Sequence, residues 1–179
     1  MKVIKYVLAA ATALVLSGCG GKTMIESDMS RMVSASPASP WLTVDNRGET
    51  VVTVTGLDST VKVQVSPDIA SVVQARLRSA LQPKYITDLI INCRGLQAAT
   101  VVVVMKDGEP AVADMELVTS CRIVARGLVA SKGYRIQQSL PVDLAAPRVD
   151  VLVSKLIDGA SSQLADKLWA DVLATGVQR

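Results

Sequence analysis

The stretch from Met115 to Arg126 reads MELVTSCRIVAR, and its alternation decides the fold. The odd positions are mostly apolar, whereas charged and hydroxyl side chains recur at the even positions. A period of two predicts a β-strand with one face on the core and the other in water. The predicted core face holds Met115, Leu117, Thr119, Cys121, Ile123 and Ala125.

Further strands are predicted on both sides of this stretch. Downstream, Ser131-Lys132-Gly133 is expected to turn the chain into a strand over 134–142. Upstream, strands are expected over 85–94 and 99–105. The second of these contains four successive valines, Val101 to Val104, and a run that is apolar on both faces indicates a strand covered on both sides.

A hairpin and a helix are predicted before these strands. Residues 49–57 and 60–65 are rich in valine, and Gly56-Leu57-Asp58-Ser59 between them is typical of a turn. Ser66-Pro67-Asp68 then has the features of a helix start, with Ser66 as the cap residue, Pro67 at the first helical position and Asp68 in the first turn. Pro83 ends that helix.

A long helix is predicted over about 146–174. Its internal Gly159 marks a bend or a close contact. The expected fold class is therefore α+β, with a mostly antiparallel open sheet of about six strands in the order β-β-α-β-β-β-β-α and two amphipathic helices packed on it. The predicted buried stripe of the last helix consists of Val149, Leu152, Val153, Leu156, Ile157, Ala160, Leu164, Leu168 and Val172.

The N-terminus has the pattern of a bacterial lipoprotein. A basic start and a short apolar run lead to Leu16-Ser17-Gly18-Cys19, so residues 1–18 are predicted to be a lipoprotein signal peptide. Cys19 would then carry a diacylglycerol group and an N-acyl chain such as palmitate, which anchor the protein in a membrane. The alternative is an ordinary secretory signal that happens to be followed by a cysteine.

The predicted mature chain divides into two parts. Residues 19–41 contain glycines, serines and two prolines without a sustained period, and are expected to be the lipidated N-terminus and a flexible tether. A partner-binding segment within the tether is the alternative to a plain spacer. Residues 42–179 are expected to form a single periplasmic domain. The residue after Cys19 is Gly20 and not the aspartate that retains many enterobacterial lipoproteins at the inner membrane. This favours sorting to the outer membrane.

Composition excludes several classes of function. The chain has 19 Lys and Arg against 16 Asp and Glu, and two of the basic residues, Lys2 and Lys5, lie in the signal segment. This balance does not indicate nucleic-acid binding. The chain has no histidine, so no Ser-His-Asp or Cys-His catalytic arrangement can be built. It also has no phenylalanine, so the core must be mainly aliphatic.

Cys93 and Cys121 remain once Cys19 carries lipid. The periplasm is oxidising, so the two are predicted to form a disulfide. Closing the loop from Cys93 to Cys121 would stabilise the fold by about 3 kcal/mol. Two separate buried thiols are the alternative.

No catalytic or metal site is predicted, and no cofactor other than the lipid on Cys19. Ser59-Thr60-Val61-Lys62 matches the Ser-x-x-Lys spacing, but this chemistry needs a helix start and the stretch falls in the predicted hairpin. Asp107, Glu109 and Asp114 could attract a cation, although a polar loop is the simpler interpretation.

Four residues are candidate partner contacts. Trp169 departs from the apolar stripe of the last helix and could be an exposed anchor, or could widen the buried face. Arg122, Arg126 and Arg135 could gather on one sheet face and meet an anionic partner, or could be a solvated surface.

Five stretches of the predicted elements carry a resemblance to known proteins: Val61-Lys62-Val63-Gln64-Val65, Leu77-Arg78-Ser79-Ala80-Leu81, Thr100-Val101-Val102-Val103-Val104, the strand Glu116 to Arg126 and the final helix with Leu164-Ala165-Asp166. With these stretches, the order of elements over about 49–174 resembles the YajG-type outer-membrane lipoproteins. Auxiliary lipoproteins of ABC-type lipid-transport systems have a similar layout. The resemblance implies an α+β periplasmic body on the outer membrane and supplies no catalytic residues.

The sequence therefore predicts a non-enzymatic outer-membrane lipoprotein that binds a protein or lipid partner of the envelope. The alternatives are a carrier of an apolar ligand held between sheet and helices, and an accessory subunit of a lipid-transport or secretion system. An enzyme that uses only Ser, Lys, Asp or Glu is a third possibility.

Overall fold

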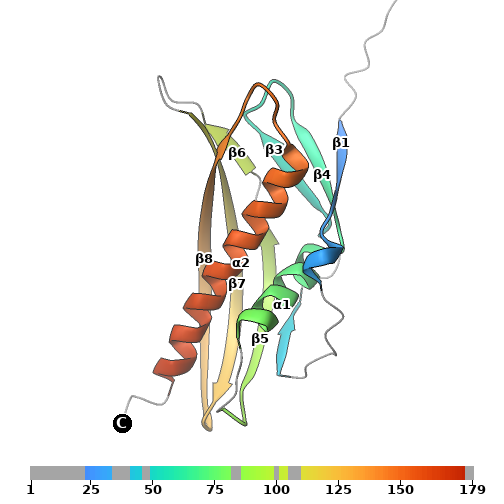
Figure 1. The fold of residues 1–179 in the computed structure, drawn as a ribbon. Helices are drawn as coiled ribbons and strands as arrows, with labels where there is room; N and C mark the ends of the chain where they lie inside the picture. Colours follow the sequence, from blue (N-terminus) through green and yellow to red (C-terminus); the bar gives the residue numbers. More distant parts are fainter. Residues whose placement is uncertain are drawn as a thin grey trace, which may run out of the picture.

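Both α-helices pack on one face of a twisted sheet (Figure 1). The structure is a computed structural model that describes residues 23–33, 41–45, 49–81, 86–98, 101–104 and 110–175. Helix α1 spans Ile69–Ala80, α2 spans Val149–Ala174, and a short 3₁₀ helix, η1, spans Ser30–Met32. The strands of the described part are β1 (Met24–Asp28), β2 (Leu42–Val44), β3 (Val51–Thr55), β4 (Val61–Ser66), β5 (Ile90–Ala98), β6 (Val101–Val104), β7 (Ala111–Ala125) and β8 (Leu128–Val142).

The hairpin of β7 and β8 is the longest feature of the sheet. The two strands pair antiparallel over their whole length, from Ala111 opposite Val142 to Ala125 opposite Leu128. Their two-residue turn is Arg126-Gly127, with φ angles of 54° and 74°. Positive φ at both positions is typical of a type I′ turn, whose twist matches that of the flanking strands.

The turn predicted at Ser131-Lys132-Gly133 is wrong. These residues lie inside β8, opposite Ser120 to Arg122 of β7. The true turn places a non-glycine residue, Arg126, at positive φ, which is uncommon outside Asn and Asp. The carboxylate of Asp88 accepts hydrogen bonds from the backbone N–H groups of Arg126 (2.9 Å) and Gly127 (2.6 Å), and so holds the turn from outside the hairpin.

Two groups of strands share the other edge of β7. β5 pairs with the half of β7 next to the turn, and β6 pairs with the half near its start. β2 adds to β5, while β3, β4 and β1 continue outward from β6. Four neighbouring pairs are antiparallel and three are parallel. The predicted α+β class with two helices on the sheet is confirmed, and the six predicted strands correspond to β3 through β8.

The N-terminal part of the body differs from the expected tether over 19–41. β1 lies within that range and runs parallel to β4, with Met24 opposite Lys62. The Ser27 hydroxyl forms hydrogen bonds with the carbonyl oxygen of Asp150 and the hydroxyl of Ser154 on α2. The pairing of β1 with β4 joins segments that are far apart in the sequence. The short, mostly polar sequence of β1 therefore has no periodic pattern that predicts a strand. Residues 19–22 and 34–40 lie outside the described residues.

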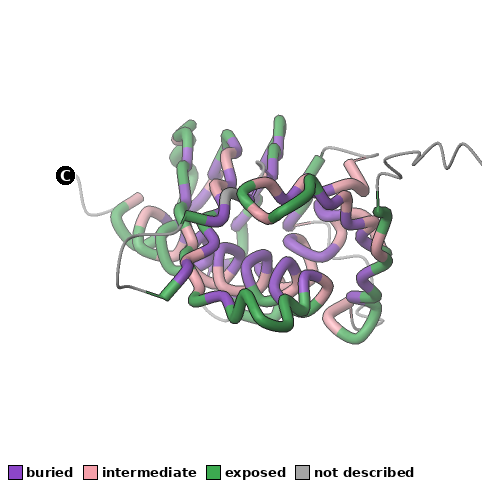
Figure 2. Tube along the Cα trace, turned by 90° about the horizontal axis from the view of Figure 1, so that it is seen from above, coloured by how far each residue is buried: buried purple, intermediate pink, exposed green. Residues whose placement is uncertain are grey.

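The core lies between the inner face of the sheet and the two helices (Figure 2). All the predicted stripe residues of α2 are buried, and so is the predicted inner face of β7. Asp68, rather than Ser66, is the N-cap of α1, because its carboxylate accepts the backbone N–H of Ser71 at 3.0 Å. Gly159 is a close contact: an added Cβ would lie 2.7 Å from Oε1 of Gln138 on β8.

A pair of methionines tests whether the segment before residue 34 belongs to the body. Met29 is 1% exposed and belongs to the core, whereas Met24 is 58% exposed. We expect Met29→Ala to lower the free energy of unfolding by about 2–4 kcal/mol, because it removes a buried side chain. Met24→Ala should change it by less than about 0.5 kcal/mol. Denaturant unfolding of both variants measures the difference, and equal effects would contradict the placement of this segment in the fold.

Candidate functional site

Cys93 and Cys121 stand directly opposite each other on β5 and β7 and form a disulfide. Their Cα atoms are 3.9 Å apart, and both side chains are buried. The bridge links the half of the sheet near the β7–β8 turn across a sequence separation of 28 residues. It is therefore a structural crosslink in the core.

The motifs with catalytic or metal-binding spacing do not come together in the described residues. Ser59 lies in the bend after β3 and Lys62 lies in β4, so this stretch is in a hairpin and not at a helix start. Asp114 accepts a hydrogen bond from the Ser139 hydroxyl on β8, while Asp107 and Glu109 lie outside the described residues. No group of three or more His, Cys, Asp or Glu in the described part could hold a metal ion.

The three candidate arginines do not form one cluster. Arg135 makes an ion pair with Glu116 at 2.7 Å on the uncovered face of the sheet. Arg126, at the turn, donates to the carbonyl oxygen of Thr175 at 3.1 Å, just past the end of α2. Arg122 lies on the uncovered face opposite Ser131, and its side chain is exposed. Of the three, only Arg122 has no ion-pair or hydrogen-bond partner among the described residues.

Trp169 belongs to the packed side of α2. It is partly buried and packs against the hydrophobic core. The geometry thus favours the interpretation in which Trp169 widens the buried face of the helix over the one in which it anchors a partner.

A polar contact holds the end of α2 against β8. Asp171 accepts hydrogen bonds from the Tyr134 hydroxyl at 2.7 Å and from Lys132 Nζ at 2.8 Å. Burial alone would raise the pKa of Asp171, but the hydrogen bonds from Lys132 and Tyr134 outweigh it, so the pKa lies below its usual value. Burial and the bond to Asp171 raise the pKa of Tyr134. The ionised carboxylate and the protonated phenol are therefore the stable pair.

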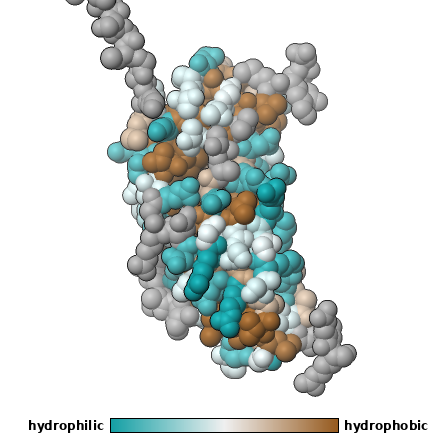
Figure 3. All heavy atoms as spheres, turned by 180° about the vertical axis from the view of Figure 1, so that it is seen from behind, coloured by the Kyte–Doolittle hydropathy of each residue, from teal (hydrophilic) through white to brown (hydrophobic). Residues whose placement is uncertain are grey.

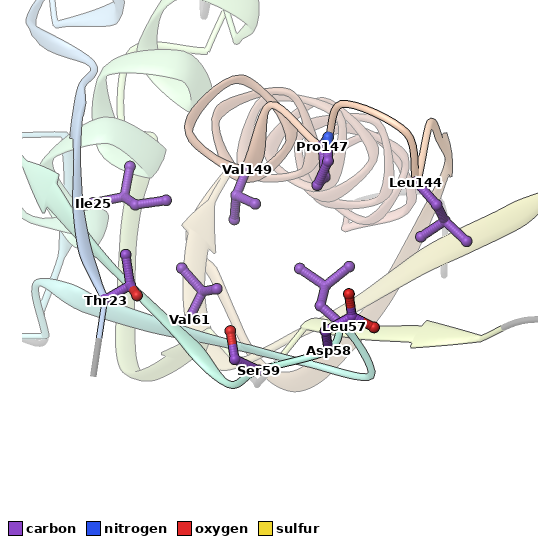
Figure 4. Close-up of a pocket in the computed structure, with 9 residues that line it drawn as sticks. All are labelled: Thr23, Ile25, Leu57, Asp58, Ser59, Val61, Leu144, Pro147 and Val149. Carbon is purple, nitrogen blue, oxygen red and sulfur yellow. The ribbon is translucent and has the colours of Figure 1, made fainter. Parts of the chain in front are cut away.

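A cavity of about 350 Å³ opens at the end of the sheet where β1 begins; we name it the anchor-end cavity (Figure 4). Its wall comes from the start of β1, the β3–β4 turn, the start of β4 and the connection from β8 into α2. Among the described residues that line it, Asp58 is the one that is ionisable. The apolar side chains around the opening are Ile25, Leu57, Val61, Leu144, Pro147 and Val149.

Gly56 fixes the β3–β4 turn that supplies one wall of this cavity. Its φ angle is +87°, and an added Cβ would lie 2.2 Å from the carbonyl oxygen of Val103. Only glycine allows both this conformation and this approach to β6. The turn predicted at Gly56 to Ser59 is confirmed, and it positions Leu57 and Asp58 at the cavity.

A second feature lies at the opposite end of the molecule, on the uncovered face of the sheet. Ile90, Val124 and Val129 stand side by side on β5, β7 and β8. Figure 3 shows a hydrophobic surface at this end, next to strongly hydrophilic side chains. The exposed Arg94 and Arg122 lie on the same face of β5 and β7. We call these five residues the far-end patch.

The two features are well separated along the sheet. Thr55, next to the β3–β4 turn, is opposite Val102 of β6, which in turn is opposite Asp114 of β7. Val124 of the far-end patch is ten residues further along β7, which corresponds to about 33 Å. Sequence reasoning named Arg122 of the far-end patch as a candidate contact but predicted neither feature as a whole, because each is assembled from strands that are distant in the chain.

Within the described residues, no helix is long and apolar enough to cross a membrane.

Comparisons with known proteins give structural similarity at low identity. No protein-family model matches the chain, and no curated protein matches it. A Caulobacter crescentus CB15 protein, provisionally described as a lipoprotein, is 11% identical with a TM-score of 0.41, over 68% of this chain and 85% of that one. Protein XCC0632 from Xanthomonas campestris, of the family DUF330, is 14% identical with a TM-score of 0.43, over 87% and 84%. TM-scores this low assign neither a family nor a function, so the resemblance to YajG-type proteins stays a prediction.

The contact between Asp171 and Tyr134 predicts an acid-dependent stability. A lowered pKa in the folded state contributes stability above the unfolded pKa of about 4, and this is lost as the pH falls through the folded value. We expect Asp171→Asn to lower the free energy of unfolding by about 1–2 kcal/mol at pH 7. The difference from the wild type should shrink below about pH 4. The matched control is Asp166→Asn, at an exposed position of the same helix, which should have the wild-type free energy of unfolding at pH 7. A constant difference down to pH 2 would contradict the assignment.

Proposed function

We propose that this protein is a non-enzymatic lipoprotein of the outer membrane whose periplasmic body binds a protein partner of the envelope. The lipid on Cys19 would hold one end of the body at the membrane. The far-end patch would meet the partner, so the protein would act as an adaptor or accessory subunit.

The far-end patch carries this proposal. Ile90 and Val129 are exposed, and Val124 between them is partly buried. A cluster of this kind on an uncovered sheet face favours a contact surface, because exposed apolar patches often mark interaction sites. Arg94 and Arg122 beside them favour a partner with an acidic rim, since complementary charges guide association. The patch lies about 33 Å along β7 from the level of the anchor-end cavity, so it would face away from the membrane that holds Cys19. A protein is therefore the partner that this surface fits best.

The anchor supports the same arrangement. Residues 20–22 separate Cys19 from Thr23, the first described residue, and four Cα steps extend to at most about 14 Å. A lipid on Cys19 would therefore keep the start of β1 close to the bilayer.

A second candidate function is that of a carrier of an apolar ligand. The anchor-end cavity favours it, because the cavity lies between sheet strands and the start of α2, as the sequence-based hypothesis of such a ligand requires.

Loss of the lipid should release the protein from the membrane. We expect the wild-type chain to incorporate labelled palmitate and to sediment with the outer-membrane fraction. Cys19→Ser should incorporate no label and should be lost from the outer-membrane fraction, because serine has no thiol to receive the diacylglyceryl group. Sedimentation of both chains with membranes, together with an unlabelled wild type, would overturn the anchor.

Charge reversal in the far-end patch should abolish partner binding. We expect crosslinking in intact cells to give one dominant adduct of the wild-type protein, and Arg94→Glu/Arg122→Glu to lower its yield at least tenfold. The control is Lys155→Glu, an equivalent change at an exposed position on α2, which lies on the opposite face of the sheet. Equal yields from the patch variant and the control would place the partner elsewhere, and no adduct with any chain would contradict the adaptor role.

A further inference from the structure

We propose that the anchor-end cavity receives one acyl chain of a phospholipid from the leaflet in which Cys19 is anchored. This inference rests on the proposed acylation of Cys19 for its location, and on the cavity itself for its chemistry. It makes the body a lipid-binding domain at its membrane end, in addition to any protein partner at its far end.

The wall of the cavity has the chemistry of an acyl-chain site. Its six apolar side chains are aliphatic, so they have no hydrogen-bonding group of their own. An aliphatic wall would keep a chain that enters from the leaflet out of water, and the chain would cover the apolar side chains of the wall, whose burial contributes roughly 25 cal/mol per Å². The volume, about 350 Å³, is near the lower end of the range for ligand pockets, so it suits one chain and not a whole lipid.

The polar groups lie on one part of the wall. Thr23, Asp58 and Ser59 belong to the start of β1 and the β3–β4 turn, and Figure 4 shows them around the lower part of the opening. Among the described residues, neither lysine nor arginine lines the cavity. The described wall therefore gives no basis for selection between zwitterionic and anionic headgroups, and the proposal concerns the acyl chain alone.

The short distance along the chain between the cavity and Cys19 indicates which ligand is available. Thr23, which lines the cavity, is four residues after Cys19. Because the four Cα steps from Cys19 to Thr23 extend to at most about 14 Å, the opening cannot move far from the leaflet that holds the acyl chains of Cys19. Phospholipid is the most abundant apolar molecule at that distance.

Exposed apolar side chains flank the same end. Leu144, in the connection between β8 and α2, is 41% exposed and lines the cavity. Met24 is 58% exposed and follows Thr23 directly. These side chains are costly in water, but they would be favourable at a bilayer interface next to an emerging acyl chain.

A phospholipid fits this site better than an acyl chain of the protein's own anchor. Withdrawal of one chain of Cys19 into the cavity would remove its methylenes from the bilayer and weaken the anchor by about 0.8 kcal/mol for each. A phospholipid chain leaves the anchor intact, and phospholipids far outnumber the anchor in the leaflet.

Photocrosslinking tests the site with the lipidated full chain in vesicles. The vesicles consist of phosphatidylethanolamine and phosphatidylglycerol, with a trace of phosphatidylcholine that carries a diazirine near the end of one acyl chain. We expect the adducts, mapped by peptide mass spectrometry, to concentrate on the β3–β4 turn and the β8–α2 connection. Leu144→Asp places a charge at the opening, and Ser59→Trp fills it; each should lower the adduct yield at these peptides at least fivefold.

The matched control is Leu128→Asp. Leu128 is 47% exposed, similar to Leu144, but lies next to the β7–β8 turn at the far end of the molecule. Its adduct yield should equal that of the wild type. Thermal unfolding of all three variants shows whether each is folded, and because Leu144 and Ser59 are exposed, at least one of these two variants should retain the wild-type midpoint.

The outcomes separate this inference from the proposed function. Palmitate labelling of the same preparation reports on the anchor alone. If Cys19 is labelled but the adducts are scattered, or are unchanged in both folded cavity variants, the cavity site is overturned and the anchor stands. If Cys19 is unlabelled, the anchor fails, and the Cys19→Ser chain mixed with the same vesicles still decides the cavity: concentrated adducts support it and their absence overturns it. Recovery of a cysteine-linked acyl chain inside the cavity would also overturn it.

Discussion

The pairing of β7 along both of its edges is the constraint on which the rest of the structure depends. One edge is filled entirely by β8, with a register set by the two-residue turn at Arg126-Gly127. The other edge is shared by β5 and β6, which lie one after the other along it. A shift of β7 by one residue would turn its buried side chains to water, so the alternation and the turn must agree. Asp88, in the segment before β5, accepts hydrogen bonds from the turn and so helps to fix the register of the hairpin from a third part of the chain.

Helix α2 closes the core over this sheet and joins its two ends. At its start, the backbone of Asp150 and the hydroxyl of Ser154 bind Ser27 of β1. At its end, Asp171 binds Tyr134 and Lys132 of β8. Between these contacts, the absence of a side chain at Gly159 lets Gln138 of β8 approach the helix, where Gln138 accepts a hydrogen bond from Gln163 at 2.7 Å. The helix therefore fixes β1 and β8, which lie at opposite borders of the sheet, relative to each other.

Local patterns in the sequence predicted those elements whose signals are local. The alternation around Cys121, the apolar stripe of α2 and the glycine of the β3–β4 turn each reflect a short-range requirement, and each gave the correct element. β1 and β2 were not predicted, because each is a short strand that forms only by parallel pairing with a distant segment. Arg126-Gly127 was missed as a turn because its first residue is unusual there, and because the group that stabilises it, Asp88, is remote in sequence.

The candidate sites follow the same division. The disulfide could be expected from the number of cysteines and the predicted periplasmic location, although only the register shows why Cys93 and Cys121 meet. The three arginines could be placed on polar positions of the hairpin, but not assigned their contacts, because Glu116 and Thr175 come from opposite sides of the sheet. The anchor-end cavity draws its wall from four separate stretches between Thr23 and Val149. No window of the sequence contains enough of such a site to reveal it.

The lengths of the body and of its connection to Cys19 together determine how the two ends could work. A connection of at most about 14 Å is shorter than the roughly 33 Å between the level of the cavity and the far-end patch. With an acylated Cys19, the cavity would stay near the bilayer however the body tilts, whereas the patch would reach the membrane only if the body lay flat. Insertion of Leu144 beside the cavity would oppose that tilt, because it adds a second point of attachment at the same end. Lipid contact at one end would thus favour the orientation in which the arginines of the other end are available to a protein.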